Sequence, residues 1–127
     1  MKANELMTGD WVLYGGEPNI ITEVSEIINE EATVCFVGNN YMANIDEIKP
    51  IPLTKEILEK NFGQQRAKGG FFYHYTGSNG ICDYIIEYYK DDFGFCRDHG
   101  GLLCRIKYVH ELQHAFRLCK IKKEIKL

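Results

Sequence analysis

The first half of the chain alternates short apolar runs with turn-forming residues, a pattern typical of β-strands joined by tight turns. Runs rich in β-branched and aromatic residues occupy residues 11–14, 20–28, 32–37, 41–43 and 48–51. The segment Asn44-Ile45-Asp46-Glu47 precedes the last run and suits one turn of 3₁₀ helix. The pattern therefore predicts a small antiparallel β-barrel of five short strands, with a one-turn helix before the fifth.

The order of these elements resembles that of SH3-like barrels. The opening residues Gly9-Asp10-Trp11-Val12 and the closing residues Asp46-Glu47-Ile48-Lys49-Pro50 are similar to the ends of such a barrel. The resemblance concerns the fold, and one fold carries many unrelated functions. We therefore expect an SH3-like β-barrel over residues 1–53 and take no function from it.

The next part of the chain predicts a short helix and then a β-meander. Thr54 is suited to cap a helix over residues 54–61, because its hydroxyl can accept a hydrogen bond from the first turn. Strand character then returns in four runs, at residues 71–76, 81–89, 93–97 and 102–107. Four consecutive strands with short connections predict an antiparallel sheet.

The C-terminal part predicts an amphipathic helix and one more strand. Over residues 108–119, the apolar side chains fall on one side of a helix. This stripe consists of Tyr108, Val109, Leu112, Ala115, Phe116 and Cys119. His110, His114 and Arg117 fall on the opposite side, which we expect to be solvated. Residues 121–127 alternate apolar residues with lysines, which predicts a last edge strand protected by charge.

Together these elements predict an α+β protein with two parts. An N-terminal SH3-like small β-barrel, residues 1–53, is followed by an antiparallel β-meander with one amphipathic C-terminal helix. The second part, residues 54–127, comprises the short helix, the meander, the long helix and the edge strand. We expect the two parts to pack together as one unit.

Charge is distributed unevenly along a chain of ordinary composition. The 127 residues are 45% hydrophobic and 26% charged, with a net charge of −3. This composition excludes a disordered chain. The chain also lacks the excess of basic residues that is typical of a dedicated nucleic-acid-binding protein. Residues 1–59 nevertheless contain 11 acidic and 3 basic residues, whereas residues 105–127 contain 2 acidic and 7 basic residues. We expect these two ends to face each other, within one chain or in a homo-oligomer. Weak nucleic-acid binding through the basic C-terminus is the alternative.

The sequence predicts a cytoplasmic protein with reduced cysteines. No apolar run is long enough for a secretory signal or a membrane span. Five cysteines, an odd number, are widely spaced and form no CxxC pair. They are Cys35, Cys82, Cys96, Cys104 and Cys119. This pattern predicts mostly buried free thiols rather than a disulfide framework or a cysteine zinc site.

One motif in the C-terminal helix carries potential chemistry. Residues 110–114 read His-Glu-Leu-Gln-His, which matches HExxH. Two imidazoles at positions i and i+4 project from one helix face and can share a zinc ion, while the glutamate activates a metal-bound water. The motif defines an alternative function, a zinc-dependent hydrolase with His110 and His114 as ligands and Glu111 as the base.

The sequence supplies no obvious third ligand for this zinc ion. Lys120 stands where the extended motif HExxHxxGxxH has its third histidine, and Glu124 is the only carboxylate side chain after the motif. Three residues that precede the motif remain candidates for the third ligand, namely His74, Asp98 and His99. The competing interpretation is that the histidines lie on the solvated face of an amphipathic helix.

Two longer segments point to a family. The run DEIKPIPLTKEILEKN at residues 46–61, together with IKYVHELQHAFRLC at residues 106–119, resembles a family of uncharacterised Bacteroidales proteins carried on prophages and other mobile elements. The resemblance spans essentially the whole chain and implies no established activity. It also implies that the position of Glu111 is often Gln and that of His114 often Asn. The family pattern therefore requires neither a metal nor a general base.

The segment 71–95 is unusually rich in aromatic residues. They are Phe71, Phe72, Tyr73, Tyr75, Tyr84, Tyr88, Tyr89, Phe93 and Phe95. Lys90 is the only basic residue in this segment, whereas base-stacking sites interleave aromatic with basic side chains. Core packing is therefore favoured, with a partner-binding patch as the alternative.

The leading functional hypothesis is a non-enzymatic accessory or protein-interaction protein of a prophage or mobile element. Under this hypothesis, we expect no catalytic residue, cofactor or metal. We expect a protein partner and no association with a membrane.

Overall fold

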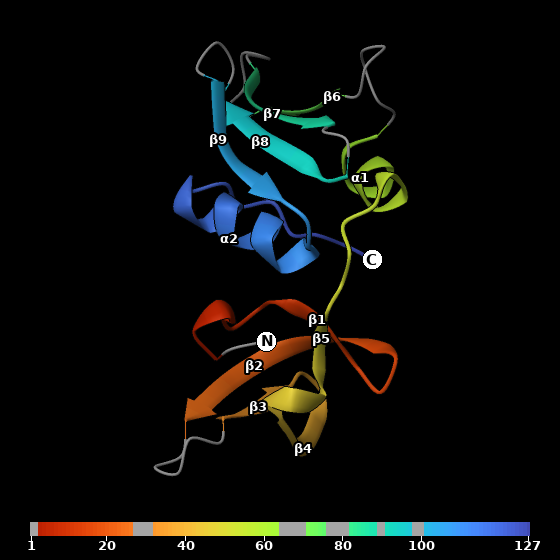
Figure 1. Ribbon diagram of the computed structural model, residues 1–127, viewed down its shortest axis with the longest axis vertical. Coiled ribbons are helices and arrows are strands. Elements are labelled where there is room, and N and C mark those ends of the chain that lie inside the picture. Colours follow the sequence, from red (N-terminus) through yellow and green to blue (C-terminus); the bar gives the residue numbers. More distant parts are fainter. Residues whose placement is uncertain (1–2, 27–31, 64–70, 76–81, 89–90, 98–100) are drawn as a thin grey trace. The chain divides into compact units, whose positions relative to one another are not determined.

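Two antiparallel β-sheets and two α-helices make up the described part of the chain (Figure 1). The computed structural model describes residues 3–26, 32–63, 71–75, 82–88, 91–97 and 101–127. The chain divides into two units, Met1–Ile51 (unit 1) and Pro52–Leu127 (unit 2), and each contains one of the sheets. The fold is therefore mixed α+β, as predicted.

Unit 1 is a five-stranded sheet with two 3₁₀ turns. Its elements are η1 (Ala3–Glu5), β1 (Trp11–Tyr14), β2 (Glu17–Glu26), β3 (Ala32–Phe36), β4 (Asn39–Asn44), η2 (Ile45–Glu47) and β5 (Ile48–Pro50). The sheet order is β4-β3-β2-β1-β5, with antiparallel neighbours. All five predicted strands and the 3₁₀ turn before the last strand are confirmed.

The sheet of unit 1 is open, so the predicted barrel closure is not confirmed. Strands β4 and β5 form its two edges, and no pairing within the described residues joins them. β5 has only three residues and ends at Pro50, which has no backbone N–H to donate to a further strand. A short strand that ends in proline therefore offers little backbone for closing a barrel.

The core of unit 1 lies on one face of this sheet. Its buried apolar residues are Leu6, Val12, Ile21, Ala32, Val34, Phe36, Ala43, Ile45 and Ile48. Asp10 is buried with them, and its Oδ2 accepts a hydrogen bond from the backbone N–H of Met7 at 2.8 Å. The carbonyl of Asp10 also accepts from the N–H of Ile21 at 2.9 Å. Asp10 thus anchors the segment before β1 to β2.

Unit 2 is a four-stranded meander with two helices. Its elements are α1 (Lys55–Phe62), β6 (Phe71–Tyr75), β7 (Cys82–Tyr88), β8 (Phe93–Arg97), β9 (Gly101–Ile106) and α2 (Val109–Leu118). The sheet order β6-β7-β8-β9 confirms the meander. Thr54 caps α1 as predicted, since its Oγ1 accepts from the N–H of Ile57 at 3.3 Å. No helix in the described part of the chain has the length and apolar character needed to cross a membrane.

The unit boundary lies between Ile51 and Pro52, two residues before the expected position. Pro52 forms an isolated antiparallel bridge with Tyr108, and the N–H of Leu53 donates to the carbonyl of Lys107 at 2.9 Å. The side chain of Leu53 is also buried. These contacts tie residues 52 and 53 to unit 2.

The core of unit 2 lies between the sheet and α2. The ring of Phe116 packs against Phe95 of β8 and Phe62 of α1, with both centroid separations at 5.9 Å. The predicted apolar stripe of α2 is largely confirmed, because Val109, Leu112, Ala115 and Phe116 are all buried.

The last seven residues do not form the predicted edge strand. Ile121 and Ile125 are buried, and the segment docks on α1. The side-chain amide of Asn61 donates to the carbonyl of Lys126 at 2.8 Å and accepts from its N–H at 2.7 Å. One asparagine side chain thus supplies the donor and acceptor that a neighbouring strand would supply, and the tail completes the core without joining a sheet.

Candidate functional site

The HELQH residues occupy the first two turns of α2, at the end of the meander (Figure 1). His110 is only 6% exposed, so the prediction that it lies on a solvated face is wrong. The ring of Tyr108 lies nearly parallel to that of His110, at an interplanar angle of 12° and a centroid separation of 5.9 Å. His114 is half-buried. Helical periodicity places His110 opposite the apolar stripe of α2, and it does not specify what packs on that side.

The two imidazoles lie close enough to share a metal ion. Their centroids are 5.5 Å apart and their planes meet at 76°. Two imidazoles bound to one tetrahedral zinc ion, with each nitrogen about 2.0–2.1 Å away, have centroids about 5–6 Å apart. His110 and His114 therefore satisfy the spacing for two zinc ligands.

Glu111 has a structural role at the start of the same helix. Its Oε1 accepts hydrogen bonds from the backbone N–H groups of Lys107, at 3.0 Å, and Tyr108, at 2.9 Å. This is the glutamate half of a capping box, in which a side chain satisfies N–H groups that have no partner within the helix. The carboxylate that the motif offers as a base thus accepts hydrogen bonds from the backbone of Lys107 and Tyr108.

The described residues contain no group of three histidine, cysteine, aspartate or glutamate side chains placed to hold a metal. Of the upstream candidates, Asp98 and His99 lie outside the described residues, as does the side chain of His74 on β6. The zinc alternative therefore has two placed ligands and a base engaged elsewhere. Zinc content of untagged protein tests it, because a site of this kind requires stoichiometric metal that is lost in His110→Ala.

Substitutions at Glu111 separate capping from catalysis. Glu111→Ala should lower the free energy of unfolding by about 1 kcal/mol, because two backbone N–H groups lose their acceptor. Glu111→Gln should cost less than about 0.5 kcal/mol, because the amide oxygen still accepts. Urea unfolding followed by circular dichroism measures both values. Equal stability of all three proteins would contradict the capping role.

The described cysteines are less buried than predicted. Cys96 is buried, Cys35 and Cys119 are half-buried, and Cys104 is exposed, all as free thiols. Burial, together with a hydrogen bond from its Sγ to Glu87 Oε2 at 3.5 Å, raises the pKa of Cys96 to about 11. Partial desolvation, then the neighbouring Cys119 and Glu111, raises the pKa of Cys104. Neither Cys96 nor Cys104 is activated as a nucleophile at neutral pH.

The pKa of Cys96 predicts slow alkylation in the folded protein. The shift from 9.0 to about 11 lowers the thiolate fraction at pH 8, and with it the iodoacetamide rate, by about 100-fold relative to the urea-unfolded chain. Because the folded pKa is the higher one, the stability that this thiol contributes is present below pH 9 and declines between about pH 9 and pH 11. Peptide mapping measures the rate. Glu87→Gln should raise it, and equal folded and unfolded rates would contradict the shift.

The described aromatic residues of the second sheet mainly pack against one another. Phe93 and Phe95 are buried, and Tyr84 stacks on Phe95 with a centroid separation of 5.2 Å. Tyr88 contacts Phe93 at 4.8 Å and is partly exposed. The remaining aromatic side chains, those of Phe71, Phe72, Tyr73, Tyr75 and Tyr89, lie outside the described residues. The core interpretation holds for the described part of the cluster.

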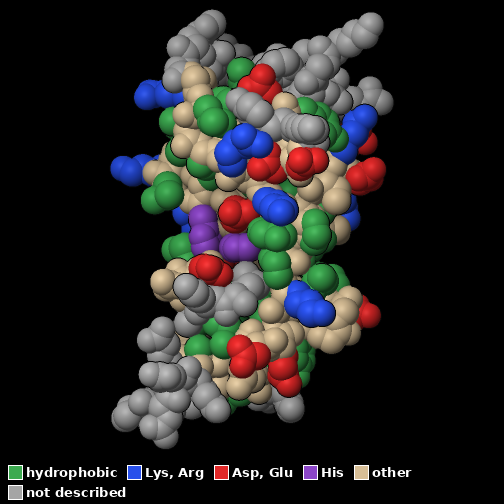
Figure 2. Space-filling view, viewed as in Figure 1, with side chains coloured by type: hydrophobic (Ala, Val, Ile, Leu, Met, Phe, Trp, Pro, Cys, Tyr) green, Lys and Arg blue, Asp and Glu red, His purple; other side chains and the backbone are tan. Residues whose placement is uncertain are grey.

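An apolar surface occurs instead on β9, one of the two edge strands of this sheet. Leu102 and Leu103 are adjacent in the sequence, yet 47% and 50% of their surfaces are exposed. The register between β8 and β9 shifts at this point, because Phe95 pairs with Cys104 and Cys96 with Leu102. Leu103 is thus the extra residue of a bulge, which disrupts strict alternation between the two faces. In Figure 2, hydrophobic and basic side chains lie next to each other along the left margin of unit 2, where Figure 1 has β9 and the end of α2.

Sequence reasoning missed this surface, although a signal was present. The last strand of a meander is an edge unless a later element pairs with it. Successive side chains of a regular strand point to opposite faces of the sheet, so two consecutive leucines cannot both face the core. The strand expected at residues 121–127 hides this signal, because a further strand could pair with β9 and cover its edge.

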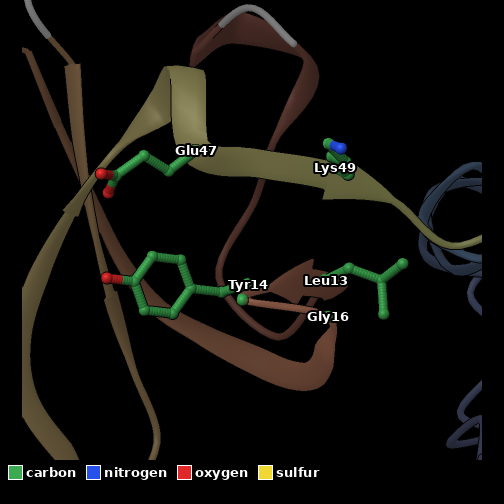
Figure 3. A pocket seen from close by; sticks show the side chains of 6 residues that line it. Leu13, Tyr14, Gly16, Glu47 and Lys49 are labelled. Carbon is green, nitrogen blue, oxygen red and sulfur yellow. The ribbon is translucent and has the colours of Figure 1, made fainter.

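A pocket of about 610 Å³ lies in unit 1, where the β1–β2 turn meets η2 and β5 (Figure 3). Its lining residues are Leu13, Tyr14, Gly15, Gly16, Glu47 and Lys49. Residues from the two ends of the unit meet here because β1 pairs with β5.

Comparisons with protein-family models, curated proteins and solved structures find no match to this chain.

Proposed function

We propose that the chain is a non-enzymatic protein-interaction protein, an accessory protein of a prophage or mobile element that acts in the cytoplasm. The observation that carries this proposal is the pair of half-exposed leucines, Leu102 and Leu103, on the edge strand β9. The resemblance of residues 46–61 and 106–119 to Bacteroidales mobile-element proteins supports the biological setting.

The leucine pair supports a protein contact on energetic grounds. Covering the exposed half of each side chain contributes about 1 kcal/mol per leucine. Edge strands of soluble proteins usually avoid exposed apolar residues, because their open backbone groups favour unwanted association. The bulge at Leu103 interrupts the row of backbone N–H and C=O groups along the edge of β9, and it leaves both leucine side chains accessible. Side-chain contact with a partner is therefore favoured over addition of a regular strand.

The structural role of Glu111 supports a non-enzymatic function, because capping accounts for the glutamate of the HELQH motif without chemistry. We also propose that unit 1 is a variant of the SH3-like fold. Its order β4-β3-β2-β1-β5 and the 3₁₀ turn before β5 support this, and the open edge between β4 and β5 sets it apart from a closed barrel.

Affinity purification with matched variants tests the interaction. Tagged wild-type chain and the double variant Leu102→Ser/Leu103→Ser are expressed in the native host, and recovered proteins are quantified. A specific partner should be at least about 10-fold depleted with the double variant, the result of losing about 1.4 kcal/mol of binding energy. Val37→Ser/Met42→Ser, which changes two exposed apolar residues of unit 1, is the control and should recover the partner normally.

Three results would overturn the proposal. One is a set of recovered proteins that is identical for wild type and the β9 variant. Another is turnover of a substrate by the purified chain that is lost in Glu111→Gln with folding intact. The third is recovery of DNA or RNA alone, bound with a steep salt dependence, which would favour the basic C-terminus as the functional surface.

A further inference from the structure

The pocket of unit 1 is built from two segments that β pairing brings together. Leu13 and Tyr14 end β1, Glu47 ends η2, and Lys49 is the central residue of β5. Leu13 pairs with Lys49 in the antiparallel register, which places these two side chains on the same face. The volume of about 610 Å³ falls within the range of about 300–1,000 Å³ that is common for ligand sites.

The turn and the aromatic wall of this pocket are held in place by local structure. Gly15 and Gly16 form a two-residue turn with φ values of 61° and 81°, a conformation that residues with a side chain rarely adopt. A Cβ at either glycine would meet no atom within 4 Å, so the turn borders open space. The Tyr14 ring packs against Phe36 with a centroid separation of 5.3 Å, which fixes one wall. Such preorganisation lowers the entropic cost of binding.

The chemistry of the pocket differs between its two ends. Figure 3 shows the Tyr14 hydroxyl and the Glu47 carboxylate extending to the same side, with Leu13 and Lys49 at the other end. Among the described residues, neither Glu47 nor Lys49 takes part in an ion pair. Residues 1–51 contain nine acidic and two basic residues. A ligand therefore meets an acidic unit. At one end of the pocket it meets an aromatic ring and a carboxylate that forms no ion pair with another described residue.

We propose that this pocket binds a lysine or arginine side chain of a peptide. The cationic group pairs with Glu47 beside the Tyr14 ring, and the aliphatic part of the ligand packs on Leu13. A cation is attracted both by the carboxylate and by the face of an aromatic ring. Lys49 restricts cation binding to the Glu47 end. This site lies in unit 1 and is independent of the β9 surface in unit 2, so either proposal can fail without the other.

Nitrogen-15 NMR titration of the full chain tests the pocket with two defined probes, acetyl-Leu-Arg-amide and acetyl-Leu-Gln-amide. The arginine probe should shift the amide signals of Gly15, Gly16 and Glu47, whereas the glutamine probe should not. Glu47→Gln should weaken binding of the arginine probe by about 5-fold, as expected for one partly exposed ion pair. Lys49→Gln should bind the probe at least as tightly as wild type does.

Glu23→Gln is the matched control, because it removes the same charge from an exposed position of unit 1 that does not line the pocket. It should leave the affinity for the arginine probe within about 2-fold of wild type. Equal weakening by Glu23→Gln and Glu47→Gln would overturn the proposal, since only the overall charge would then matter. Equal shifts with both probes, or no shift at about 20 mM probe, would overturn it as well.

Discussion

Replacing Ile125 with alanine should lower the free energy of unfolding of unit 2 by about 2–4 kcal/mol. Ile125 is 4% exposed although it belongs to a segment without regular secondary structure. The substitution removes buried methyl and methylene groups and leaves a cavity, since neighbouring side chains relax only partly. On an exposed edge strand, the same substitution would cost less than about 1 kcal/mol.

Urea unfolding followed by the helical circular dichroism signal measures this effect, because both α-helices belong to unit 2. Glu124→Ala, at the adjacent exposed position, is the control and should change the free energy by no more than about 0.5 kcal/mol. If Ile125→Ala is as mild as Glu124→Ala, the C-terminal segment is not part of the core.

Replacing Asp10 with alanine should destabilise unit 1 by about 2–3 kcal/mol. Asp10 is 0% exposed, and its carboxylate accepts the N–H of Met7 at 2.8 Å. The alanine variant leaves that N–H without this acceptor, and hydrogen bonds to charged groups are worth about 1.5–3 kcal/mol. Asp10→Asn keeps an acceptor oxygen of similar shape and should cost about half as much.

Fluorescence of Trp11, the only tryptophan of the chain, follows the unfolding of unit 1 because the residue begins β1. Glu17→Ala, an exposed acidic position on β2, is the control for the loss of one negative charge. A similar, small change in Asp10→Ala and Glu17→Ala would show that the buried carboxylate does not anchor the turn before β1.

The HELQH motif illustrates how one pattern can have two physical explanations. Glu111 is the third residue of α2, where backbone N–H groups of the first turn and the preceding residues attract a carboxylate. A glutamate at that position is favoured in many helices, and a histidine on each side at the right spacing completes the motif. The HExxH pattern specifies only the spacing of side chains along a helix. Whether its glutamate caps the helix or is available as a base depends on where the helix begins.

The strands of both sheets, the 3₁₀ turn, the Thr54 cap and the apolar stripe of α2 could all be predicted, because each follows from neighbouring residues. Alternation of side chains, turn glycines and capping hydroxyls act over a few positions. The tail prediction was wrong because the same alternation suits any extended segment, whether or not a strand lies beside it. Asn61, 65 positions away from Lys126, decided that outcome.

The sequence by itself determined the local elements, the order of the two parts and the list of residues able to carry chemistry. Only the tertiary structure decided that His110 is buried, that Leu102 and Leu103 are exposed, and that Glu47 and Lys49 line one pocket with Tyr14. The physical reason is the range of the interactions. Hydrogen bonds and steric preferences between neighbours specify an element, while burial and pairing depend on which distant segment covers it.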